Sequence, residues 1–144
     1  MRSILTISAV LALALSAQVR ADDAGDPAAG EKVFAKCKSC HSIVDGENVI
    51  QKGGKTGPNL FGIIGRPAAS EEGFKYGDGI LEAAAKGLVW DEENLADYVE
   101  DPTEFLDEFT GNKKLKSKMT FKLNKGEKDI AAYLASLSPV PATN

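Results

Sequence analysis

Cys37-Lys38-Ser39-Cys40-His41 is the most informative run of this 144-residue chain. Its two thiols are three positions apart, so on a helical turn they lie on one face. An imidazole follows the second thiol directly. This spacing is the attachment signature of a c-type haem, in which both thiols add to the vinyl groups of one porphyrin. His41 would then bind the iron from one side of the ring.

A pair of cysteines at this spacing has other possible uses. A thioredoxin-like dithiol belongs to a βαβ framework, which this sequence does not show. A structural zinc site needs four ligands, and the chain has only two cysteines and one histidine. A plain disulfide would leave His41 and the glycine-rich segment 42–79 unexplained. One covalently attached haem c per chain is therefore the favoured interpretation.

Met119 is the predicted sixth ligand of the iron. A buried methionine is ordinarily core filler. Here, however, no second histidine exists and the only other methionine is the initiator. An open sixth position, as in a peroxidase or gas sensor, and a lysine ligand are the alternatives. His/Met ligation favours Fe(II) and fills both axial positions, which predicts a one-electron carrier without a small-molecule substrate rather than an enzyme.

The first 21 residues have the pattern of a secretory signal. Arg2 supplies the positive start, residues 4–17 are mostly apolar, and Val19-Arg20-Ala21 offers a cleavage site, with cleavage after Ala17 as the alternative. The apolar run is too short to span a bilayer as a helix. We therefore expect residues 22–144 to form one mono-haem domain in the periplasm.

Charge is distributed in two blocks. The formal net charge of −4 argues against a nucleic-acid partner. Residues 91–108 contain nine acids and no base, whereas residues 113–128 contain seven lysines and one acid. These blocks are either two solvated faces or a dipole that orients the protein toward a charged partner. Because several lysines surround Met119, we favour docking on membrane redox complexes through a ring of lysines, namely Lys36, Lys38, Lys55, Lys114, Lys116, Lys118 and Lys122.

The hydrophobic pattern predicts an all-α fold. No segment alternates with period two, and apolar residues recur at helical spacing. Capping residues mark helix starts at Asp26, Asp91 and Asn124, and prolines mark the first helical positions at Pro27 and Pro102. The predicted helices run from Pro27 to the haem motif, over 80–86, from Asp91 to Asp101, over 102–109, and from Asn124 toward Pro139. Segment 42–79 is predicted to be loops that wrap a large rigid ligand.

Motifs along most of residues 22–144 closely resemble those of the class I cytochromes c, especially the periplasmic cytochrome c2 and respiratory cytochrome c proteins of proteobacteria. They are Gly30…Phe34…Cys37–His41, Lys55–Leu60, Gly65-Arg66, Trp90, Tyr98, Lys118–Phe121 and Ala132–Leu134. The resemblance implies about five helices with long loops around the haem. It also implies a soluble, monomeric carrier between a cytochrome bc1-type complex and a terminal oxidase or photosynthetic reaction centre.

The same resemblance implies roles for individual residues. The carbonyl of Pro58 would accept the Nδ1–H of His41, and the Tyr98 hydroxyl would donate toward the sulfur of Met119. A haem propionate would be bound by Arg66, Tyr76 and Trp90. For Trp90 and Tyr98, core packing is the alternative. Gly30 and Phe34 would meet Ile130 and Tyr133 where the first and last helices cross.

Overall fold

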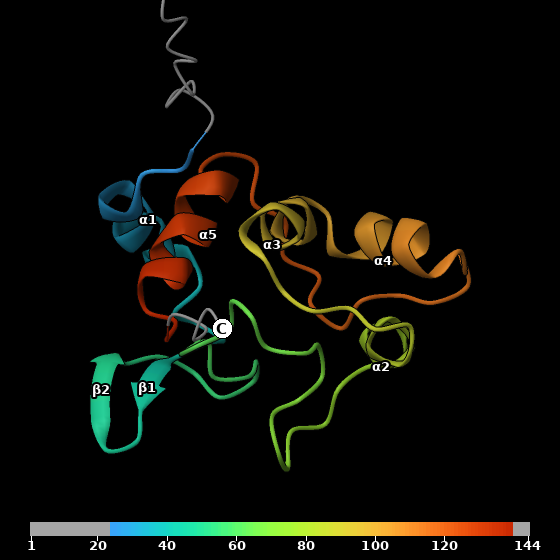
Figure 1. Ribbon diagram of the computed structural model, residues 1–144, viewed down its shortest axis with the longest axis horizontal. Helices are drawn as coiled ribbons and strands as arrows, with labels where there is room; N and C mark the ends of the chain where they lie inside the picture. Colours follow the sequence, from blue (N-terminus) through green and yellow to red (C-terminus); the bar gives the residue numbers. More distant parts are fainter. Residues whose placement is uncertain (1–23, 140–144) are drawn as a thin grey trace, which may run out of the picture.

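The computed structural model describes residues 24–139, so the predicted signal segment 1–21 lies outside the described part of the chain. Figure 1 shows helices grouped around a long looping segment, with a small hairpin at one side. The elements are α1 (Pro27–Val33), the 3₁₀ turn η2 (Phe34–Lys36), β1 (Ile43–Asp45), β2 (Asn48–Gln51), α2 (Asp78–Ala85), α3 (Glu92–Glu100), α4 (Pro102–Thr110) and α5 (Glu127–Ser136).

Helices α1 and α5 pack against each other, as Figure 1 shows. A Cβ added at Gly30 would lie 2.0 Å from the carbonyl oxygen of Asp129 and 2.7 Å from Cβ of Tyr133. Glycine is therefore required for the two backbones to approach this closely. The ring of Phe34 lies 6.3 Å from that of Tyr133. The predicted crossing of the first and last helices is confirmed.

The charged helices α3 and α4 begin as the sequence predicts. Asp91 caps α3 by accepting the N–H of Asn94 at 2.8 Å, and the Asn94 side chain accepts the N–H of Asp91 in return. Asp101 caps α4 by accepting the N–H of Glu104 at 3.2 Å. Pro102 follows at the first helical position, where a missing N–H is tolerated. The two helices therefore meet at Asp101.

Three local expectations were wrong, namely the extent of the first helix, the assignment of segment 42–79 to loops alone, and the start of the last helix. The first helix is α-helical only to Val33, and the haem motif follows it as a separate turn in which the N–H of His41 bonds the carbonyl of Cys37 at 2.9 Å. Segment 42–79 also contains the antiparallel hairpin β1–β2, whose strands are too short to show a period-two pattern. Gly46 forms its turn with a φ of +57°. These strands are a small addition to an otherwise helical fold.

The last helix begins at Glu127, after Gly126 with a φ of +93°, and not at the predicted cap Asn124. The reason is a contact with a segment distant in the sequence. The N–H of Leu123 bonds the carbonyl of Val99 at 2.8 Å, and the Leu123 side chain is buried against the core. This contact holds the chain next to α3 and delays the start of the helix.

The core lies between the helices and the looping segment. Its fully buried large side chains are Phe34, Ile43, Pro102, Leu106, Leu123 and Ile130. Within residues 24–139, every helix is too short or too polar to cross a membrane.

Candidate cofactor-binding site

The two thiols lie on the turn that follows η2 and are free. Cys37 is half-buried, and burial raises the pKa of its thiol to about 11, with a smaller contribution from the nearby Cys40. Cys40 is exposed, and hydrogen bonds from Thr56 and Ser39 lower the pKa of its thiol. One thiol therefore faces the interior and the other faces solvent, both within one turn.

The imidazole of His41 has a defined tautomer. Its Nδ1 lies 2.8 Å from the carbonyl oxygen of Pro58. A carbonyl can only accept, so Nδ1 carries the proton and Nε2 keeps its lone pair. Burial lowers the pKa of His41, which keeps the ring neutral at neutral pH. Nε2 is thus prepared to act as a metal ligand, and the Pro58 carbonyl raises its basicity.

Gly57 packs directly against the ring of His41. A Cβ at this position would lie 2.2 Å from Cε1 and 2.6 Å from each ring nitrogen of His41. Side chains larger than hydrogen would therefore displace the ring from the Pro58 carbonyl.

Arg66 is held by hydrogen bonds to the loop that follows His41. Its Nη2 donates to the carbonyl of Asn59 at 2.9 Å and its Nη1 to that of Phe61 at 3.3 Å. The N–H of Asn59 is accepted by the carboxylate of Glu71 at 2.7 Å, and the N–H of Glu71 is accepted by the hydroxyl of Tyr76 at 3.1 Å. Arg66 and Tyr76 are thereby joined in one network.

This network contains a buried donor without an acceptor. Nε of Arg66 is buried and has no hydrogen-bond partner within the described residues. A buried guanidinium N–H is costly to leave unpaired, and a carboxylate is its best partner. The hydroxyl of Tyr76 accepts one bond and still has its own hydrogen to donate. Both groups fit a carboxylate supplied from outside the chain, as a haem propionate would be.

Trp90 and Tyr98 connect the Arg66 segment to the Met119 segment. The backbone of Trp90 pairs with that of Arg66, and the rings of Trp90 and Tyr98 lie 5.0 Å apart. The hydroxyl of Tyr98 lies 3.1 Å from Oγ of Ser117, which in turn accepts the N–H of Met119 at 3.1 Å. Sequence reasoning expected this hydroxyl to reach the Met119 sulfur. The structure pairs it with the Ser117 hydroxyl, so Tyr98 positions the segment that carries Met119, and the contact with the sulfur stays a prediction.

Six of the predicted site residues are thus joined, through Asn59 and Ser117, in one continuous chain of contacts. Its order is His41, Pro58, Asn59, Arg66, Trp90, Tyr98, Ser117 and Met119. Met119 itself is half-buried. The two candidate iron ligands therefore stand at the two ends of a frame built from five separate segments. Among residues 24–139, no three His, Cys, Asp or Glu side chains converge as a possible metal-binding group.

Sequence reasoning missed the residues that complete this frame. Asn59 and Glu71 bond backbone groups of distant residues, and Ser117 contacts the distant hydroxyl of Tyr98. No periodicity in the sequence marks such contacts. A weak signal exists for Ser117, since a hydroxyl two positions before a candidate ligand can accept that ligand's N–H.

The seven lysines of the predicted docking ring are all exposed, but they differ in their contacts. Lys118 donates to the carbonyl of Lys75 at 3.1 Å. Lys122 forms an ion pair with Asp101 at the junction of α3 and α4. Its charge is therefore partly neutralised and is directed toward the acidic helices, which the docking prediction did not expect.

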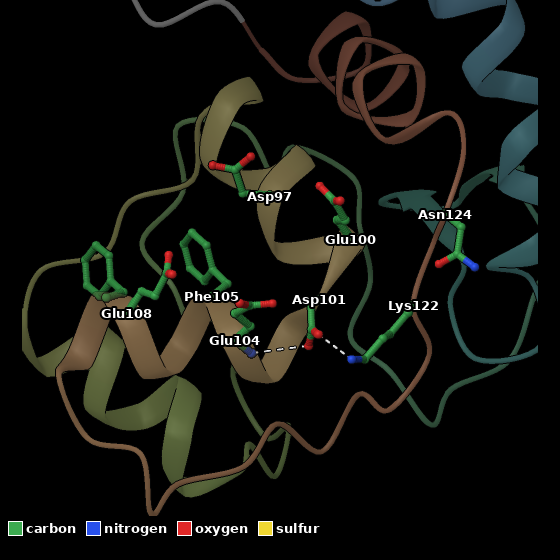
Figure 2. A pocket seen from close by; sticks show the side chains of 9 residues that line it. Asp97, Glu100, Asp101, Glu104, Phe105, Glu108, Lys122 and Asn124 are labelled. Carbon is green, nitrogen blue, oxygen red and sulfur yellow. Dashed lines mark hydrogen bonds and ion pairs between the residues drawn. The ribbon is translucent and has the colours of Figure 1, made fainter.

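A groove lies beside this ion pair, between α3, α4 and the segment that carries Lys122 (Figure 2). It is lined by Asp97, Glu100, Asp101, Glu104, Phe105, Glu108, Phe109, Lys122 and Asn124. None of the predicted cofactor-binding residues belongs to this lining, so the groove is separate from the predicted cofactor site.

Comparison with known proteins gives a consistent result, although no protein-family model matches the chain. Cytochrome c-550 of Paracoccus pantotrophus is 58% identical over 119 residues, which cover 80% of this chain and 88% of that protein. Cytochrome c2 of Rhodobacter capsulatus is 51% identical over 139 residues, covering 95% and 98%. The solved structure of ferric cytochrome c-550 from Paracoccus versutus superposes with a TM-score of 0.77 at 56% identity, covering 80% of this chain and 99% of that one.

Proposed function

Because the chain belongs to the class I cytochromes c, we propose that it is a periplasmic one-electron carrier whose haem iron is bound by His41 and Met119. The predicted fold and the predicted cofactor, one covalently attached haem c, are confirmed by this membership. Proteins of the family are haem-containing electron carriers and generally not enzymes. The ligand assignment, the partners and the location are our inference.

The observation that carries the assignment of His41 is the contact between its Nδ1 and the carbonyl oxygen of Pro58. Its Nδ1–H is committed to the Pro58 carbonyl at 2.8 Å, and its Nε2 is left with a free lone pair. When bound, the haem supplies an iron that changes between Fe(II) and Fe(III) by one electron. His41 and Met119 would both bind the iron, which would leave no place for an exchangeable ligand and would favour electron transfer over bond chemistry.

Cys37 and Cys40 would hold the porphyrin covalently. Arg66 and Tyr76 would bind one propionate, since Arg66 has a buried N–H without an acceptor and Tyr76 has a hydroxyl hydrogen to donate. Keeping that propionate ionised requires these donors, because an unpaired buried carboxylate would be protonated.

We place the carrier between a cytochrome bc1-type complex and a terminal oxidase or reaction centre. The support is the separation of charge along the chain, with exposed lysines near both the thiols and Met119. Such an arrangement orients a protein toward an acidic partner surface and makes the association rate depend on salt. We expect the protein to act as a monomer, exported by the signal in residues 1–21.

A visible spectrum of the purified holoprotein tests the proposal. We expect a low-spin spectrum that does not change when carbon monoxide is added to the reduced protein. Met119→Ala should open the sixth position and allow rapid carbon monoxide binding. Leu115→Ala removes a half-buried apolar side chain from the same loop and should leave the spectrum unchanged. Carbon monoxide binding by the wild type would indicate an open site and an enzyme or sensor instead.

A further inference from the structure

The segment that carries Met119 is attached to α3 and α4 on both sides of that residue. Before it, Ser117 Oγ contacts the Tyr98 hydroxyl at 3.1 Å, and the Ser117 N–H donates to Thr103 Oγ1 at 3.3 Å. After it, the Leu123 N–H bonds the Val99 carbonyl at 2.8 Å. Lys122, next to Leu123, adds the ion pair with Asp101.

The orientation of the Asp101 carboxylate favours the ion pair with Lys122. One carboxylate oxygen accepts the N–H of Glu104 and caps α4, while the other oxygen pairs with Lys122 (Figure 2). The helix cap therefore fixes the orientation of the carboxylate that pairs with Lys122. The exposed fraction is 24% for the Asp101 side chain and 54% for that of Lys122, so the pair is accessible to salt.

Residues between the two attachments are less constrained. Thr120 and Phe121 are exposed, with Phe121 at 44%. Movement of Met119 away from the site therefore requires that one of the two ends detach. The Lys122 end depends on one backbone hydrogen bond, one buried leucine and one exposed ion pair, so the ion pair is the part that salt and mutation can change alone.

We propose that Asp101 and Lys122 form a latch that keeps the Met119 segment closed and limits replacement of Met119 by external ligands. Asp101 and Lys122 are positioning residues in this proposal, which rests on the proposed ligation of iron by Met119. An external ligand binds only when the segment is open, so its affinity rises in proportion to the open fraction. Exposed ion pairs contribute little, so we expect a change of about two- to fivefold.

The first measurement is the affinity of imidazole for the ferric holoprotein. Lys122→Met and Asp101→Asn should each raise it about two- to fivefold, and asparagine keeps the α4 cap. The double variant should bind imidazole no more tightly than the stronger single variant, because both substitutions remove the same interaction. Lys125→Met is the matched control, since Lys125 is an exposed lysine three residues further along. High salt should raise the wild-type affinity toward that of Lys122→Met.

The second measurement does not depend on the ligand. Amide hydrogen exchange of Leu123 reports opening of its bond to Val99, and Lys122→Met should accelerate it while Lys125→Met should not. Equal exchange and equal imidazole affinity in these two variants would overturn the latch. If Met119→Ala leaves the spectrum unchanged, the proposed ligation fails, and faster Leu123 exchange would then show a latch without a role at the iron, which also overturns the proposal as stated.

Discussion

Substitution of Gly57 by alanine should damage the His41 side of the site directly. The added Cβ would lie 2.2 Å from Cε1 of the His41 ring, whereas an ordinary contact is at least 3.4 Å. The ring or the Gly57 backbone must therefore yield by about 1.2 Å. A shift of this size takes the Nδ1 to carbonyl distance of 2.8 Å beyond the range of a hydrogen bond.

Two costs follow from that displacement. Loss of the hydrogen bond costs about 0.5–1.5 kcal/mol, and overpacking costs about 1–3 kcal/mol. The free energy of unfolding of the holoprotein should fall by roughly 2–4 kcal/mol. A less basic imidazole stabilises Fe(III) less, so the reduction potential should rise by roughly 20–60 mV.

Urea unfolding of the ferric holoprotein and a redox titration measure these effects. Gly46→Ala is the control, because Gly46 has a positive φ but nothing within 4 Å of an added Cβ. We expect that variant to lose about 1–2 kcal/mol through backbone strain and to keep the wild-type potential. The reasoning would be refuted if Gly57→Ala matched Gly46→Ala in both measurements.

Three further predictions concern charge. Arg66→Met should lower the reduction potential by roughly 20–60 mV, because a positive charge beside the propionate favours Fe(II). Arg66→Lys should recover part of the loss. A redox titration that shows no change in either variant would exclude Arg66 from the propionate site. Burial lowers the pKa of His41 below its ordinary value of 6.5, and iron held at Nε2 would oppose protonation in the same direction, so the unfolded chain binds the proton more readily than the folded protein. The free energy of unfolding should reach its full value above pH 6.5 and fall as the pH decreases, and a flat profile from pH 7 to 5 in urea titrations would contradict this. Lys116→Gln should slow reduction by an acidic partner complex at low salt more than Lys122→Gln does, because Asp101 already offsets the charge of Lys122. Equal stopped-flow rates for the two variants would indicate that Lys122 belongs to the docking surface after all.

Features set by neighbouring residues were predictable from the sequence. The thiols and His41 must share one turn because they bind one ring, so their spacing alone reveals the cofactor. Helix starts at Asp26, Asp91 and Asp101 depend on a side chain that bonds an N–H two or three residues later, which is also local. Gly30 was informative because a mid-helix glycine indicates a close helix crossing.

Contacts between distant segments were decided only by the tertiary structure. The orphaned Nε of Arg66, the pairing of Tyr98 with Ser117 and the ion pair of Lys122 with Asp101 each join residues that no pattern relates. The start of α5 belongs to the same class, because a bond between Leu123 and Val99 overrides a local cap at Asn124. Short-range order follows from backbone stereochemistry, whereas the partner of a side chain depends on which surfaces the whole chain buries together.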